Sequence, residues 1–254
     1  MATESKLNPF VSHSRLTENK FLKTLELLLE GESAALISDK VDIDRNTANA
    51  YAHALRVRIA KYCEERYRPL SFSKMPVATS FKNTKNDPRF REWQVVEKRK
   101  RTNKTGKKVL NKDKPILIRA LKRKPSHFAI KVLEDGKVWT ALIPKWDDFN
   151  YLYRAEKYLS RSGTWKQWLA FDAIAGYGSE KPLRILKQDN SPEVKGFWYD
   201  FISTLKKRRG TNDRNFYYHL KEAEFRHNTQ NENPTAILAA ELLKTPLSLD
   251  LSKP

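Results

Sequence analysis

The chain has 254 residues with 49 Lys or Arg and 30 Asp or Glu, a formal net charge of 49 − 30 = +19. Hydrophobic residues make up 39%, which is enough for a core and excludes a wholly disordered chain. One cysteine, Cys63, excludes an internal disulfide framework and a cysteine-built zinc site. No apolar run approaches the roughly 20 residues of a membrane span, and the polar start, Met1–Pro9, predicts no secretory signal. These features predict a cytoplasmic protein with a polyanionic partner.

The positive charge is concentrated in two clusters. Residues 98–124 contain thirteen Lys or Arg and one acid, a net of 13 − 1 = +12, and a second cluster covers residues 206–209. Such clusters release counterions from nucleic acid and give salt-sensitive affinity for it. The alternatives are a solvated loop, a localisation tract and, as a weaker rival, an anionic membrane surface. The cations expected to contact DNA are Lys98, Arg99, Lys100, Arg101, Lys107, Lys108, Lys206, Lys207, Arg208 and Arg209.

Residues 1–68 predict a helical module. After a loose leader of about fourteen residues, three helices are expected, capped by Thr17, Ser33 and Asp44 and running to Glu30, to Lys40 and to about Glu65. Gly31 ends the first helix, and Val41–Asp44 makes a compact turn between the last two.

Two helices joined by a four-residue turn are typical of a helix-turn-helix that places its second helix in a DNA major groove. Arg45, Asn46 and Asn49 are the candidates for reading bases, because Arg pairs with guanine and Asn with adenine. The candidates for phosphate contacts are Thr47, Arg56 and Arg58. The alternative is an ordinary three-helix bundle with a polar, solvated face.

Residues 69–92 predict a linker and residues 93–245 a mixed domain, followed by a flexible tail at 246–254. The expected strands are 93–96, 116–121, 128–133, 138–143 and 168–174. Asp135-Gly136 marks a tight hairpin between the third and fourth of these. The expected helices are 147–159, 193–207, 213–228 and 235–243. The fold class is therefore α/β (α+β), a small helical module before a domain of strands and helices.

The C-terminal third carries the most specific pattern. Phe197-Trp198 is followed by a Lys/Arg-rich turn with Gly at 206–210 and by the helix Phe216–Asn228, which reads FYYHLKEAEFRHN. This order resembles the closing signature of bacterial insertion-sequence transposases of the ISXO-two-like (DDE-type) family. The resemblance implies a DNA-binding module followed by a ribonuclease H-like domain with a mixed sheet and C-terminal helices. Members often begin with a zinc ribbon, for which this chain lacks the cysteines.

The side chains of this signature also have a structural interpretation. Its aromatic and aliphatic residues are suited to a helix core, and Glu222 and Arg226, at i and i+4, are expected to form an ordinary surface pair.

The resemblance also implies where catalysis would take place. Transposases of this type cut and join DNA with Mg²⁺ held by three acids. Asp172, expected at a strand end, fits the second acid, and Glu97 fits the first if the opening strand is 94–97, whereas a strand at 116–121 carries no acid. The third position holds Lys195, which would repel a metal ion, and Glu193 is about 200° away around the helix. An active enzyme would therefore use Asp172, Glu97 and Glu193, with Asp172 binding metal.

We therefore expect a transposase-like protein with an eroded catalytic centre that binds double-stranded DNA through its helix-turn-helix and basic patches. A homodimer or another protein partner is compatible with this reading, and the expected location is the bacterial cytoplasm, associated with the nucleoid. The alternatives are an active Mg²⁺-dependent transposase and an RNA-binding module, the latter suggested by the many Trp and Tyr residues.

Overall fold

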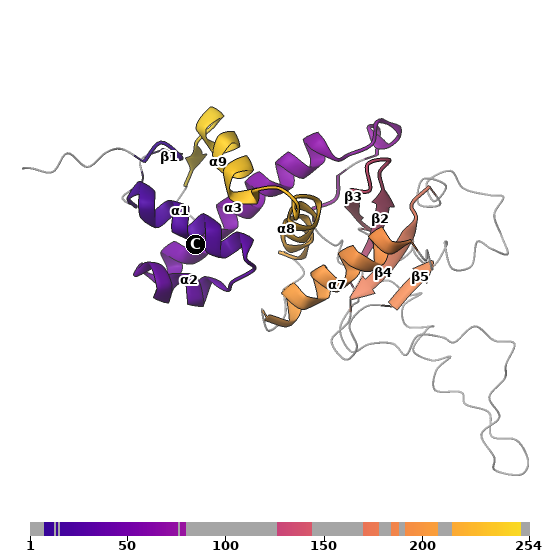
Figure 1. Ribbon diagram of the computed structural model, residues 1–254, viewed down its shortest axis with the longest axis horizontal. Helices are drawn as coiled ribbons and strands as arrows, with labels where there is room; N and C mark the ends of the chain where they lie inside the picture. The colour runs from indigo at the N-terminus through magenta and orange to yellow at the C-terminus, as the bar shows by residue number, and fades with distance from the viewer. Residues whose placement is uncertain are drawn as a thin grey trace, which may run out of the picture.

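A computed structural model describes part of the chain, namely residues 8–12, 14, 16–75, 77–79, 126–143, 170–177, 184–187, 191–207 and 215–249. The helices are α1 (Glu18–Leu29), α2 (Ala34–Val41), α3 (Arg45–Arg66), α7 (Pro192–Lys207), α8 (Phe216–Asn228) and α9 (Pro234–Lys244), with a 3-10 turn η1 (Leu70–Phe72). The strands are β1 (Val11–Ser12), β2 (Ser126–Val132), β3 (Val138–Leu142), β4 (Ala173–Tyr177), β5 (Arg184–Lys187) and β6 (Leu247–Ser248). The protein therefore mixes helices and sheet, as the sequence predicts (Figure 1).

The three N-terminal helices begin where the sequence places their caps. The hydroxyls of Thr17 and Ser33 accept hydrogen bonds from the first turns of α1 and α2. Asp44 Oδ1 accepts from the backbone N–H of Asn46 at 2.8 Å and of Thr47 at 3.2 Å. These bonds satisfy N–H groups that have no partner within the helix, which fixes each helix start.

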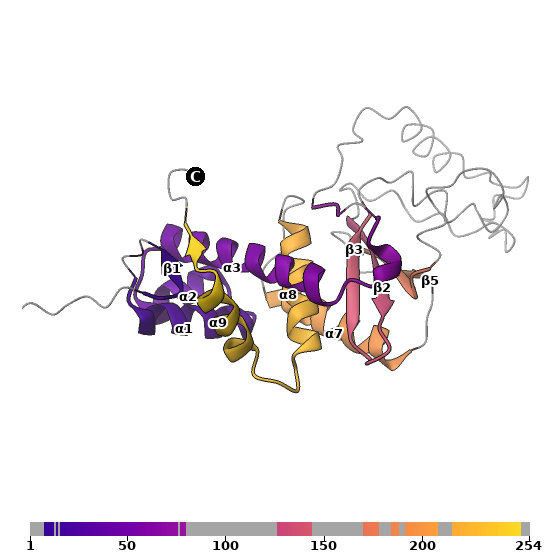
Figure 2. The same ribbon diagram turned by 90° about the horizontal axis from the view of Figure 1, so that it is seen from above.

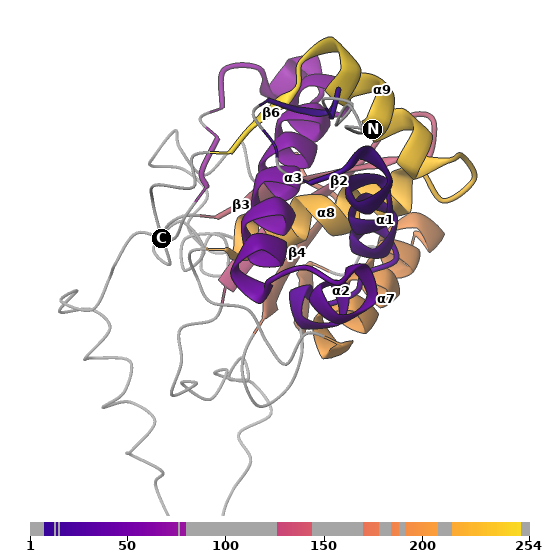
Figure 3. The same ribbon diagram turned by 90° about the vertical axis from the view of Figure 1, so that its left-hand side faces the viewer.

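Helix α3 is the central element of the N-terminal half. Ala48, Ala52, Leu55 and Ile59 are fully buried, and Cys63 continues the buried face one turn later. Helices α1 and α2 pack beside α3, and α8 lies across it (Figure 3). Because neighbours cover α3 on more than one side, a change in its rotation would expose these apolar residues to water.

Strands β2 to β5 form one sheet in the order β3-β2-β4-β5, and every neighbouring pair is antiparallel. The hairpin between β2 and β3 turns at Gly136, whose φ of 78° confirms the expected Asp-Gly turn. The mixed sheet that the family resemblance implies is thus not seen among the described strands. The expected strands 93–96 and 116–121 and the expected helix 147–159 lie outside the described residues.

The expected strand 168–174 differs from the observed one, because β4 begins at Ala173. Phe171 and Asp172 form a bend before it. The Asp172 backbone N–H donates to the carbonyl of Ile130 at 2.9 Å, and its side chain accepts from the N–H of Val132. Hydrogen bonds to β2 therefore fix Asp172 in place one residue before β4 begins.

Helices α7 and α8 cover the sheet with aromatic side chains. Phe128 of β2 is buried among the rings of Phe201 and Phe216, whose centroids lie 5.2 and 6.0 Å from its own. In Figure 1, the N-terminal helices lie at one end of the molecule and the sheet at the other, with α8 between them. Helix α8 contacts both α3 and β3, so it joins the two ends.

The chain returns to its N-terminal helices near its end. Strand β6 pairs in parallel with β1, and the N–H of Leu247 donates to the carbonyl of Phe10 at 2.8 Å. Helix α9 packs on α1 beside this pair (Figure 2). Leu247 is buried, so residues 247–248 belong to the folded part, although the sequence predicts a flexible tail from residue 246. The predicted boundaries at residues 68 and 93 stay predictions.

Within the part of the chain that the structure describes, none of the helices combines the length and the apolar composition needed to cross a bilayer.

Candidate nucleic-acid interface

The turn between α2 and α3 is held by hydrogen bonds from both sides. Asp42 ends α2 in the left-handed region with φ of 54°. The Lys20 ammonium of α1 donates to the carbonyl of Asp42 at 2.7 Å, and the Ser38 hydroxyl donates to the carbonyl of Ile43 at 2.7 Å. Helix α1 and the turn therefore fix the start of α3 relative to α2.

The start of α3 presents polar side chains to solvent. Arg45, Asn46 and Asn49 are exposed, and Thr47 is half-buried. Among the described residues, the side chains of Arg45, Asn46 and Asn49 form no hydrogen bond or ion pair. At 100° per residue, Asn46 and Asn49 lie about 60° apart around the helix. The structure thus brings the three expected base-reading residues to one accessible face.

Arg56 was expected to contact phosphate, but the structure gives it a partner inside the protein. Its Nε lies 2.7 Å from Glu222 Oε2 of α8, with 12% of the Arg56 side chain and 0% of the Glu222 side chain exposed. Loss of one member of such a buried pair leaves the other charge uncompensated. Arg56 therefore joins α3 to α8. Arg58 is half-buried and lies about 120° around the helix from Asn46, on the side of Thr47.

His53 belongs to the same exposed face, although the sequence interpretation omits it. It is exposed and lies about 20° from Asn46 around α3. Its ring meets that of Tyr218 edge-on, with centroids 5.3 Å apart. The spacing 46, 49 and 53 is the helical i, i+3, i+7 pattern, and this signal could have identified His53 from the sequence.

Asp172, the expected metal ligand, is already paired. Its Oδ1 lies 3.0 Å from Lys131 Nζ, and its Oδ2 accepts the backbone N–H of Val132 at 2.7 Å. Both members of the ion pair are about a quarter exposed, at 28% for Lys131 and 27% for Asp172. A lysine ammonium therefore neutralises the carboxylate where a Mg²⁺ ion would be expected.

The other two acids expected in the catalytic centre are Glu97 and Glu193. Glu193 is half-buried in the first turn of α7, Lys195 is exposed on the same helix, and Glu97 lies outside the described residues. No three His, Cys, Asp or Glu side chains of the described ranges converge as metal ligands would.

Helix α8 carries a buried charge cluster. The Lys221 ammonium donates to the carbonyl of Thr140 at 2.7 Å and to Glu224 Oε2 at 2.9 Å. It also lies 2.7 Å from Glu64 Oε1 of α3. Lys221 and Glu224 are completely buried, and Thr140 donates to Glu224 through both its N–H and its hydroxyl, at 2.8 and 2.5 Å. The cluster therefore joins α3, α8 and β3 through charged hydrogen bonds.

Burial and charge act against each other in this cluster. Burial lowers the pKa of Lys221, but the nearby carboxylates of Glu224 and Glu64 outweigh it, so the pKa is raised and the lysine stays charged. Burial, reinforced by the Glu224 carboxylate, raises the pKa of the Cys63 thiol well above its usual value. The cluster holds one cation between two carboxylates, which is suited to holding elements together.

The expected surface pair of Glu222 and Arg226 is wrong. Glu222 is completely buried and pairs with Arg56 of α3, 166 residues away in the sequence. Arg226 donates instead to the hydroxyl of Thr204 on α7 at 2.8 Å. Helix packing brings a distant partner to each side chain, and these partners replace the local i, i+4 contact.

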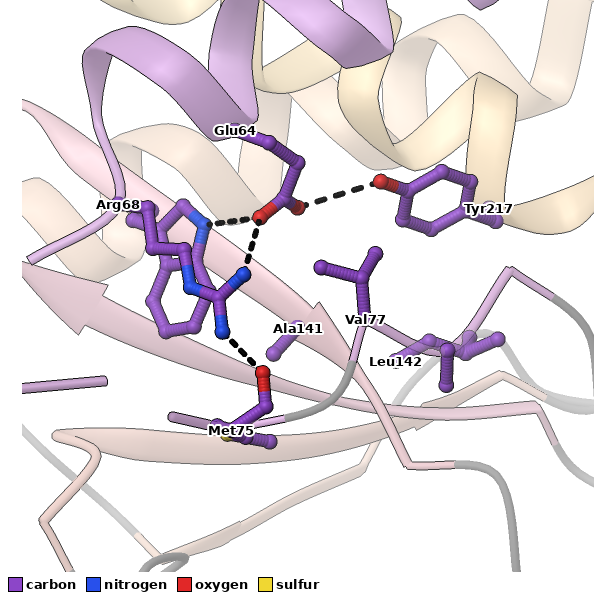
Figure 4. A pocket seen from close by; sticks show the side chains of 9 residues that line it. Glu64, Arg68, Met75, Val77, Ala141, Leu142 and Tyr217 are labelled. Carbon is purple, nitrogen blue, oxygen red and sulfur yellow. Dashed lines mark hydrogen bonds and ion pairs between the residues drawn. The ribbon is translucent and has the colours of Figure 1, made fainter. Parts of the chain in front are cut away.

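A small pocket next to the cluster is filled mostly by its own side chains (Figure 4). The Glu64 carboxylate accepts from Trp139 Nε1 at 3.4 Å and from the Tyr217 hydroxyl at 3.2 Å, and it faces Arg68. Arg68 in turn donates to the carbonyl of Met75. The space left has room for about one water molecule, far less than a small-molecule site needs. We therefore assign it a structural role.

The strongest basic cluster is not part of the described structure. Lys98, Arg99, Lys100, Arg101, Lys107, Lys108, Arg208 and Arg209 lie outside the described residues, and Lys206 and Lys207 are placed only as the last residues of α7. Their contacts with DNA stay predictions.

Comparisons of the chain with models of protein families, with curated proteins and with solved structures found no match.

Proposed function

We propose that this protein binds duplex DNA through the exposed face of α3 and derives from a transposase whose catalytic centre has eroded. The observation that carries the proposal is that Arg45, Asn46 and Asn49 are exposed together at the start of α3, directly after a turn that hydrogen bonds hold in place. A major groove is wide enough for one helix, and side chains of the first turns then reach the base edges.

The charge of the chain supports the same partner. A net charge of +19 attracts a polyanion over the whole surface, and phosphate contacts from Lys and Arg release condensed counterions. In this proposal the cations of residues 98–124 and 206–209 follow the DNA backbone, and α3 supplies the base contacts.

The region behind the helical module then acts as a ribonuclease H-like scaffold. The ion pair between Asp172 and Lys131 supports this role, because a lysine ammonium holds the carboxylate that an active enzyme would use for Mg²⁺. The family resemblance places such a protein in the bacterial cytoplasm, on the nucleoid, alone or as a homodimer.

Binding of the full chain to a fluorescent 30-base-pair duplex, measured by anisotropy across a salt series, tests the proposal. If six to ten phosphates are contacted, affinity falls by about 10³ to 10⁵ between about 50 and 200 mM salt. Replacing both Arg45 and Asn49 by alanine weakens binding about tenfold or more. Lys244→Ala, which also removes one positive charge from an exposed position, leaves binding nearly unchanged. The proposal is overturned if the natural chain does not bind the duplex, or if the Arg45 and Asn49 double variant binds it with the same affinity as Lys244→Ala.

Two further arms of the same experiment separate the alternative functions. If the protein binds a single-stranded RNA of equal length more tightly than the duplex, its partner is RNA and not duplex DNA. If the protein nicks the duplex in the presence of Mg²⁺ and the Asp172→Asn variant does not, the protein is an active enzyme and not a scaffold.

A further inference from the structure

The exposed polar face of α3 continues beyond the residues that the helix-turn-helix pattern predicts. Asn46, Asn49 and His53 are all exposed and lie within about 60° of one another around the helix. The buried residues Ala48 and Leu55 lie on the other side and fix the rotation of α3. The three side chains therefore form a line of carboxamide, carboxamide and imidazole along about two helical turns.

Packing against α8 limits this line at its far end. The ring of His53 meets Tyr218 edge-on at 5.3 Å, and Arg56, one turn further, pairs with Glu222. A duplex lying along α3 would therefore contact residues 45 to 53 and would meet α8 beyond them. The accessible length of α3 is about 12 Å, at 1.5 Å per residue.

The spacing of the line suits neighbouring base pairs. Asn46 and Asn49 are separated by about 4.5 Å along the helix axis, and Asn49 and His53 by about 6 Å. Successive bases of one DNA strand are about 3.4 Å apart. Each side chain can therefore meet a different base within a segment of about four base pairs.

The chemistry of the line selects the bases. An asparagine carboxamide donates to N7 and accepts from the N6 amino group of adenine, and no other base offers that pair in the major groove. We infer that Asn46 and Asn49 read two nearby adenines of one strand and that His53 contacts the purine edge beside them, so that the duplex bound carries an A·T-rich core. This inference rests on the proposed function and specifies the DNA sequence class of that site.

Selection of bound duplexes from a library with a randomised ten-base-pair core, followed by sequencing, tests the inference on the full chain. The expected result is enrichment of adenine at two neighbouring positions of one strand. In Asn49→Ala, discrimination for adenine at one of them falls by about 5- to 150-fold, the range for one bidentate contact, while overall salt-dependent binding remains. In His53→Ala, the preference at the adjoining position weakens.

Asn231→Ala is the matched control, because Asn231 is also exposed but lies between α8 and α9. It should select the same sequences as the natural chain. Duplex binding without adenine enrichment, or an Asn49→Ala profile equal to that of Asn231→Ala, overturns the inference while leaving duplex binding intact. Failure of the natural chain to bind any duplex overturns both the inference and the proposed function.

Discussion

Replacing Lys221 by methionine removes a completely buried ammonium while keeping most of the side chain's volume. In the native protein this ammonium lies 2.9 Å from Glu224 Oε2 and 2.7 Å from Glu64 Oε1. The substitution leaves the Glu224 carboxylate buried without its cation, with Glu64 as a second negative charge nearby. Breaking a buried ion pair by removing one partner typically costs about 3–5 kcal/mol. We expect a loss of this size in the free energy of unfolding.

Urea unfolding followed by circular dichroism measures the loss in the free energy of unfolding, and a thermal scan measures the melting temperature. At about 2–4 °C per kcal/mol for a chain of this size, the melting temperature should fall by about 6–20 °C. A double variant, Lys221→Met with Glu224→Leu, should recover part of the lost stability, because it removes the uncompensated charge together with its partner. Recovery is incomplete because the N–H and the hydroxyl of Thr140 lose their acceptor. A loss below about 1 kcal/mol for Lys221→Met, or no recovery in the double variant, would refute a buried charge cluster that joins α3, α8 and β3.

Three further predictions concern other parts of the fold. The folded state raises the pKa of the Cys63 thiol, so this thiol keeps its proton at a pH where the thiol of the unfolded chain ionises. The free energy of unfolding should therefore fall above about pH 9 by about 1.4 kcal/mol per pH unit. Urea unfolding of Cys63→Ala, measured over the same pH range, should lack this one-proton slope. Asp44→Ala removes the cap of α3 and should lower the free energy of unfolding by about 0.5–2 kcal/mol, whereas Asp44→Asn should retain most of it. Gly31→Ala should lower the melting temperature, because φ is +87° and the added Cβ would lie 2.7 Å from Arg226 Nη1; an unchanged melting temperature would contradict this close packing.

Local signals in the sequence were sufficient for much of the fold. The caps of α1, α2 and α3 were predicted correctly because a cap is a contact between residues two or three positions apart. The hairpin at Asp135-Gly136 was predicted for the same reason, since the turn requires a positive φ at the glycine. The exposed start of α3 follows from the cap at Asp44 and the apolar spacing behind it.

The contacts that the sequence could not predict are those between distant residues. The sequence predicts a phosphate contact for Arg56 as it does for Arg58, and only the packing of α8 shows that Arg56 pairs with Glu222. Lys221, Glu222 and Glu224 follow one another closely in the sequence, as charged residues of a solvated helix face do, yet all three are completely buried. Periodicity extended a strand through Asp172, whereas hydrogen bonds to β2 place this residue in a bend.

The central claim is that the exposed face of α3 lies against DNA bases. Photo-crosslinking tests it most directly, with a photoreactive amino acid placed at position 49 of the full chain and, in a second protein, at position 231. With a bound duplex, we expect crosslinks to bases from position 49 and none from position 231. A duplex that is bound with equal affinity but crosslinks from position 231, and not from position 49, would contradict the account.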